Sequence, residues 1–113
     1  MKITDWRTQE IKDTPHKVDV RQLYDTADAQ VMHITLQPGE KLKPHITPVD
    51  VFFFVLEGTP DIMVGKERQT IINAGLLVES PKDIVHCLYN ESDTIARIMV
   101  VKVPKPTTTT RLL

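Results

Sequence analysis

Two histidines are the residues of this sequence best suited to chemistry. His45 lies in the stretch GEKLKPHITPVDVFFFVLEG, and His86 lies in the stretch GLLVESPKDIVHCLYN. A neutral imidazole is a ligand for iron, nickel and zinc, and it titrates near neutral pH. Two imidazoles with one carboxylate form a ligand set that suits iron(II) and leaves coordination positions open. The candidate metal ligands are therefore His45, His86 and the nearby carboxylate of Asp50.

Four further residues are candidates for the wall of a substrate pocket: Thr47, His33, Phe53 and Arg97. Thr47 follows His45 by two positions, so both side chains share one face of a strand that carries them. If its face lines the pocket, His33 is a third ligand or a general base; the alternative is a core or surface histidine. Arg97 suits either a substrate carboxylate or phosphate, or an ion pair at a subunit surface.

The orientation of Asp50 depends on the register of the strand that follows Pro48. If His45 and Thr47 face inward, alternation predicts that Val51 faces inward and that Asp50 faces outward. A bulge at Pro48 would reverse both orientations. An outward Asp50 would cap the turn of the segment TPVD. The sequence leaves both orientations open.

Short strands must position these residues. Glycines and prolines separate apolar runs that are rich in β-branched and aromatic residues, which predicts an antiparallel sandwich or barrel. The expected strands lie in the runs VMHITL, VFFFVL, IMVG, QTII, IVHCLY and IARIMVVKV. The segment 19–30 offers one helical turn at most. Within VFFFVL, neighbouring phenylalanines such as Phe53 and Phe54 are expected to point to opposite faces.

The two histidine stretches resemble the paired motifs of the cupin family. The second stretch matches its motif at Gly75, Pro81, His86 and Asn90, with Asp83 where a glycine is usual. The first stretch matches at Gly39, His45 and Gly58, and it departs at Thr47 and Val51, where the family has a histidine and a glutamate. The resemblance covers residues 30–103.

This resemblance implies an all-β fold, a double-stranded β-helix or jelly-roll barrel whose mouth holds a ligand or a metal. Cupin metals include iron, manganese, nickel and zinc, held by three histidines and a glutamate; His45 matches the first ligand and His86 the last. Because the family includes isomerases, dioxygenases and binding proteins, the fold alone fixes no function. We expect a small-molecule-binding cupin with a partial divalent-metal site, either a metal-dependent isomerase or dioxygenase or a non-catalytic metabolite-binding or sensing protein without metal.

Three segments differ in character. Residues 1–29 are expected to supply strands that pack on the barrel of residues 30–103, and residues 104–113 are expected to form a flexible tail because they lack a core pattern. The run 95–103 is apolar on both alternating faces. A strand with one wet face would alternate more cleanly. We therefore expect a homodimer in which one sheet packs against the partner.

Composition excludes several classes of protein. The 14 basic and 15 acidic residues leave a net charge of −1, which argues against a nucleic-acid partner. The longest apolar run, VFFFVL, is far shorter than the roughly 20 residues that span a bilayer, so no membrane association is expected. The single cysteine cannot form an intrachain disulfide. Together with the absence of a signal-like apolar run, this favours a cytoplasmic location.

Overall fold

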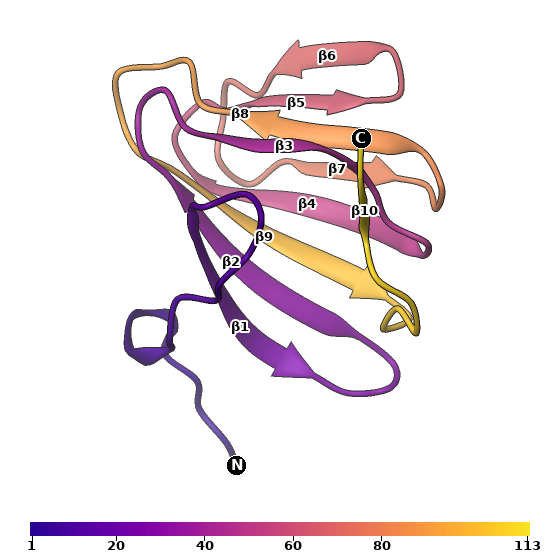
Figure 1. Cartoon of the computed structure of the whole chain (residues 1–113). Coiled ribbons are helices and arrows are strands. Elements are labelled where there is room, and N and C mark those ends of the chain that lie inside the picture. Colours follow the sequence, from indigo (N-terminus) through magenta and orange to yellow (C-terminus); the bar gives the residue numbers. More distant parts are fainter.

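Two five-stranded antiparallel sheets face each other in the computed structural model, which describes residues 1–113 (Figure 1). The first sheet has the order β1 (Asp19–Asp25), β2 (Gln30–Leu36), β9 (Ala96–Val103), β4 (Asp50–Glu57) and β7 (Leu77–Ser80). The second has the order β10 (Arg111–Leu112), β3 (Lys41–Ile46), β8 (Val85–Tyr89), β5 (Asp61–Val64) and β6 (Glu67–Thr70). This architecture confirms the expected all-β barrel. The fold contains no helix with the length and hydropathy of a membrane span.

Each of the six expected apolar runs contributes to a strand, and four further strands form outside these runs. The segment expected to offer a helical turn instead contains β1, which pairs with β2 at the edge of the first sheet. Helical propensity is a weak preference that such pairing overrides. The single helical element, η1 (Trp6–Thr8), is one 3-10 turn that precedes β1. Strands β3 and β7 lack an unbroken apolar run, so local composition does not indicate them.

The end of the chain lies against the barrel instead of standing free. Strand β10 pairs with β3, with Arg111 opposite Ile46 and Leu112 opposite His45. The amide of Leu113 then donates to the carbonyl of Pro44 at 3.2 Å. The segment expected to be a flexible tail therefore extends the second sheet beside His45. Backbone hydrogen bonds to β3 hold it there, and its side-chain pattern does not predict them.

Alternation along β4 and β9 builds the inner face of the first sheet. In β4, Val51, Phe53 and Val55 are buried, and in β9 the buried set includes Ile98 and Val100. The ladder between β4 and β9 runs without a shift from Asp50 to Val55. No bulge reverses the register there, so Val51 faces inward and Asp50 faces outward.

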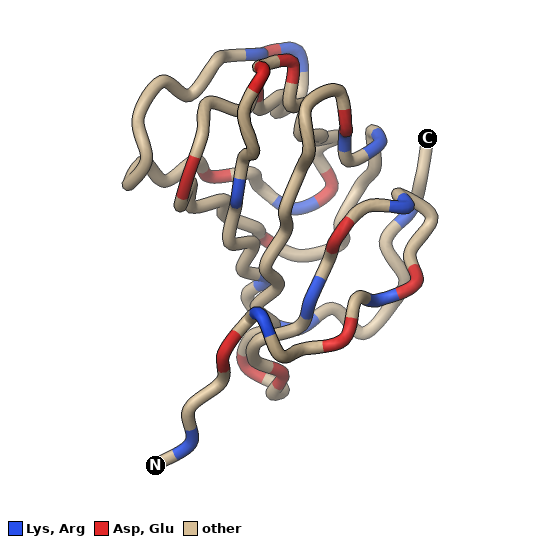
Figure 2. Tube along the Cα trace, turned by 90° about the vertical axis from the view of Figure 1, so that its left-hand side faces the viewer, with Lys and Arg blue, Asp and Glu red and all other residues tan.

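Charged residues are spread over the whole trace. Figure 2 shows lysines and arginines interspersed with aspartates and glutamates, without a continuous stripe of one sign. The near balance of charge in the sequence is therefore also a balance in space.

Candidate functional site: the cavity between the sheets

His45 and His86 meet inside the barrel although they are far apart in the sequence. Strands β3 and β8 are neighbours, and their register places the two histidines directly opposite each other. Cross-strand partners have Cβ atoms about 4.5–5.5 Å apart, so their side chains can touch. The two Nε2 atoms lie 3.0 Å apart, and the residues are only 6% and 1% exposed. The structure thus brings the two candidate ligands to one point.

Hydrogen-bond partners determine the tautomers of this pair. His45 Nδ1 lies 2.6 Å from the carbonyl oxygen of Lys43, which can only accept, so Nδ1 carries the proton and Nε2 is an acceptor. His86 Nε2 therefore donates to His45 Nε2. His86 Nδ1 then accepts a hydrogen bond of 2.7 Å from the Ser80 hydroxyl. The hydroxyl oxygen of Thr47 lies 3.2 Å from His86 Nε2. The result is an ordered polar chain at the centre of an apolar barrel.

Burial keeps the imidazoles inside the barrel neutral. It lowers the pKa of His86 to about 3, and the neighbouring His45 adds to the decrease. Burial also lowers the pKa of His45. His16, from the loop before β1, has a pKa lowered to about 4, first by burial and then by His45. These rings therefore act at neutral pH as uncharged donors and acceptors.

A cavity of about 150 Å³ surrounds the pair. Its apolar wall includes Met32, Ile34, Leu42, Phe53 and Val100. Its polar wall includes, besides the two histidines, Thr14, His16, Thr47, Lys102 and Thr110. No acidic residue lines it. A cavity of this volume holds a molecule the size of benzene. Thr47 and Phe53, two of the four expected pocket residues, thus lie in its wall.

Asp50 does not join the two histidines. Its side chain is exposed, and Oδ1 accepts a hydrogen bond of 2.9 Å from the backbone amide of Lys82. It borders a separate surface depression of about 300 Å³ that also includes Phe52 and Val103. The expectation of Asp50 as a third ligand is corrected by the register of β4, which gives the inward position to Val51.

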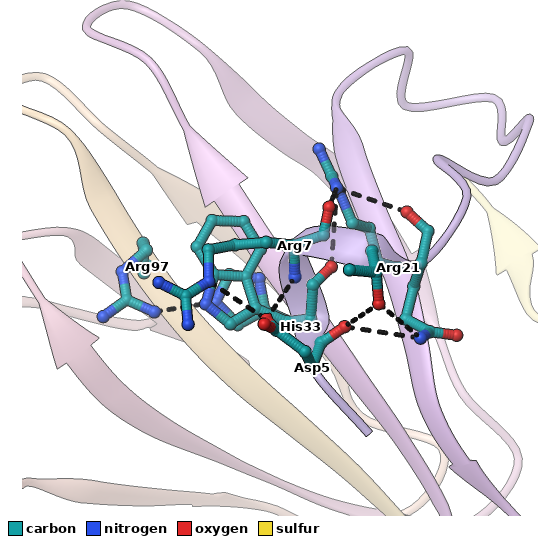
Figure 3. Close-up of polar contacts among 8 residues, drawn as sticks. Asp5, Arg7, Arg21, His33 and Arg97 are labelled. Atoms are coloured by element: carbon teal, nitrogen blue, oxygen red, sulfur yellow. Dashed lines mark hydrogen bonds and ion pairs between the residues drawn. The ribbon is translucent and has the colours of Figure 1, made fainter. Parts of the chain in front are cut away.

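His33 and Arg97 also lie outside the cavity, on the outer face of the first sheet (Figure 3). The ring of Trp6 stacks on His33 with a centroid distance of 4.1 Å. Arg97 Nη1 donates to His33 Nε2 at 3.0 Å, and Arg97 Nε donates to Glu57 at 2.6 Å. The inner positions of β2 belong to its alternate residues, which include Ile34. The expectation that His33 and Arg97 line the pocket is corrected accordingly.

Acidification is expected to destabilise the fold. The pKa is about 4 for His16, about 4 for His33, where burial acts first and Arg97 second, and about 3 for His86. An unfolded histidine titrates near 6.5, so the unfolded chain binds more protons between these values. Stability that is complete above about pH 6.5 is therefore lost as the pH falls towards 4. Denaturant titrations across this range would measure it, and a flat profile would contradict the buried neutral histidines.

The sequence does not predict two titratable residues of the cavity wall, Lys102 and His16. Lys102 occupies the inward-facing parity of β9, two positions after Val100, and this alternation was a signal that could have identified it. His16 gave no such signal, because a loop carries it into the wall. Its position is held by a hydrogen bond of 2.9 Å from the Lys43 amide to His16 Nδ1.

The donor set does not make the four-ligand metal site that the resemblance implies. No group of three or more histidine, cysteine, aspartate or glutamate side chains is placed to hold a metal ion. His16 cannot complete a site in this arrangement, because its Nδ1 accepts a hydrogen bond from the Lys43 amide and the proton of the neutral ring is therefore on Nε2. His45 and His86 supply two nitrogen donors. A carboxylate is absent from the cavity wall.

Comparison with known proteins gives the family. The sequence model described as "Cupin domain" matches residues 32–102. The protein TT1209 from Thermus thermophilus is similar at 26% identity, with 94% of this chain and 100% of that chain covered and a TM-score of 0.79. An RmlC-like cupin family protein from Methanocaldococcus jannaschii is similar at 25% identity, with 88% and 91% covered and a TM-score of 0.73.

A third solved structure shares the fold at lower identity. The polyketide cyclase RemF from Streptomyces resistomycificus is 18% identical, with 100% of this chain and 85% of that chain covered and a TM-score of 0.80. The chain matches no curated protein. Since the family match spans more than half of the sequence and includes both histidines, this chain belongs to the cupin family.

Proposed function

We propose that this cupin binds a small organic molecule in the cavity between its sheets, with His45 and His86 as the central polar contacts. The observation that carries the proposal is the pair of Nε2 atoms 3.0 Å apart in the wall of an otherwise largely apolar cavity. Apolar walls with a few convergent polar groups are typical of small-molecule sites. Such a site fixes the ligand's orientation through the histidines and gains affinity from the apolar wall.

A divalent ion such as Fe, Mn, Ni or Zn has two protein donors here, the Nε2 atoms of His45 and His86. For both to coordinate, His86 would adopt the other tautomer, and its Nδ1–H would then donate to Ser80. The serine hydroxyl allows this because it can donate or accept. With only two nitrogen ligands, we propose that the ion exchanges freely instead of residing permanently.

The binding function is favoured over a metal-dependent isomerase or dioxygenase. An enzyme of either type would use a metal as Lewis acid or oxygen activator, and that role requires an ion held in fixed geometry. The residues at Thr47 and Val51 supply no ligand of the kind that the family uses there. The proposed role is therefore to hold or sense a metabolite, and a catalytic role is the second candidate.

Metal titration separates these two roles. By equilibrium dialysis against Zn²⁺, we expect the wild-type protein to bind one ion, and subsequent dialysis without metal should remove it. His45→Ala and His86→Ala should each abolish this binding and leave the circular dichroism spectrum unchanged, because the barrel has its own core. His33→Ala, outside the cavity, is the control and should bind as the wild type does. An ion that survives dialysis would favour the enzyme.

We also propose that the chain forms a homodimer through the outer face of its first sheet. Cross-strand partners share a face, and one row across this sheet contains Leu77, Phe54 and Met99. Leu77 is 51% exposed, and Phe54 and Met99 are only partly buried. A second copy would cover this apolar row. Light scattering at micromolar concentration should give the mass of a dimer, and Phe54→Glu should give a monomer. A monomeric wild-type protein would refute the assembly.

A further inference from the structure

Lys102 places a positive charge in the cavity without an acidic partner. It lies on the inward parity of β9 and lines the cavity together with His45 and His86. None of the seven ion pairs in the structure includes it. Burial, and then repulsion by Lys12, lowers its pKa. A half-buried ammonium group without a counter-charge is costly, so its position calls for an anion that the chain does not supply.

Two further polar residues that line the same cavity as Lys102 also offer donors. His16 Nδ1 accepts from the Lys43 amide, so His16 Nε2 carries a proton. The hydroxyl oxygen of Thr14 is buried without a hydrogen-bond partner, and Thr14 lines the same cavity. Buried hydroxyl groups without partners are uncommon in folded proteins. This part of the wall therefore offers three donors, which are the ammonium of Lys102, the N–H of His16 and the hydroxyl of Thr14. No carboxylate of the chain lies in the wall to accept their hydrogen bonds.

We propose that this part of the cavity binds the carboxylate of a small organic acid, with Lys102 as its counter-charge and His16 and Thr14 as hydrogen-bond donors. This inference rests on the proposed function and names the ligand class. One lysine matches the single charge of a carboxylate better than the double charge of a phosphate. The rest of the ligand lies against the apolar wall near Phe53 and Ile34, where the volume of about 150 Å³ limits it to about one ring or a short chain.

Benzoate and benzamide form a matched pair of probes, since they share shape and differ in charge. We expect calorimetric titration of the full chain to show benzoate binding more tightly than benzamide. Lys102→Met keeps the length of the side chain and removes its charge. It should weaken benzoate binding roughly 10- to 100-fold, the value of a charged hydrogen bond, and leave benzamide binding unchanged. Lys66→Met, at an exposed turn, is the control and should change neither.

The outcomes distinguish the inference from the proposed function. Equal affinity for the two probes, or unchanged benzoate binding by Lys102→Met, would overturn the carboxylate site but leave cavity binding intact. If neither probe binds the wild-type protein, the inference fails and the proposed function loses its support. Should Lys102→Met not fold, the comparison of the two probes on the wild-type protein still decides the inference, because it needs no variant.

Discussion

Phe53→Ala is expected to lower the free energy of unfolding by about 3–5 kcal/mol, as truncation of a fully buried phenylalanine does. Phe53 is 1% exposed and belongs to the core between the two sheets. Its ring also meets His86 edge to face with a centroid distance of 5.2 Å. The variant therefore loses buried apolar surface and the edge-to-face contact with His86. Chemical denaturation monitored by circular dichroism measures the change.

Phe54→Ala is the matched control for this prediction. Phe54 points to the outer face, where it pairs with Met99 and Leu77 and is only partly buried. In the monomer, Phe54→Ala should lower the free energy of unfolding by less than Phe53→Ala does. In the proposed homodimer, where the partner covers Phe54, the two losses should be more similar. A loss below about 1 kcal/mol for Phe53→Ala, the range of surface positions, would contradict the inward orientation of this side chain.

Gly58→Ala is expected to be the other severe substitution. Gly58 has a φ of +83°, in the left-handed region, and an added Cβ would clash with the carbonyl oxygen of Ile95 and lie 2.8 Å from Cα of Ala96. A strained backbone conformation alone costs about 1–3 kcal/mol. The clash with backbone atoms adds to this cost, because β9 begins at Ala96 and cannot move without disturbing the sheet.

Gly39→Ala separates the two contributions. Gly39 has a φ of +86°, but an added Cβ would meet no atom within 4 Å. This variant should show the conformational strain without the clash. Thermal and denaturant unfolding of both variants would measure the difference. Equal losses of stability would mean that the contact of Gly58 with β9 contributes nothing.

The fold could be predicted because it depends on features that the sequence displays. Spaced glycines, prolines and histidines marked the two motifs, and apolar runs marked six strands. Strand β1 forms a hairpin with β2, the next strand along the chain, and β10 pairs with the distant β3. The side chains of β1 and β10 show too weak a pattern to predict this pairing, because strand formation depends more on the neighbouring strand than on local composition.

The site could be predicted in part, for similar reasons. His45, Thr47 and Phe53 were found by motif position and alternation, and these rules hold within one strand. The orientation of Asp50 required knowledge of the register, which a single bulge would have reversed. The sequence leaves both faces open for His33, and the structure places it on the outer face, where the ring of Trp6 stacks on it. His16 reaches the cavity through a loop, so no periodicity indicates it.

Histidine ring nitrogens offer the most direct test of a ligand-binding cavity around His45 and His86. In nitrogen-15 NMR spectra recorded during benzoate addition, we expect the Nε2 signals of His16, His45 and His86 to shift together. The signals of His33 should stay in place, because this ring lies on the outer face beneath Trp6. Unchanged signals from all three cavity histidines, or a shift confined to His33, would contradict the proposal.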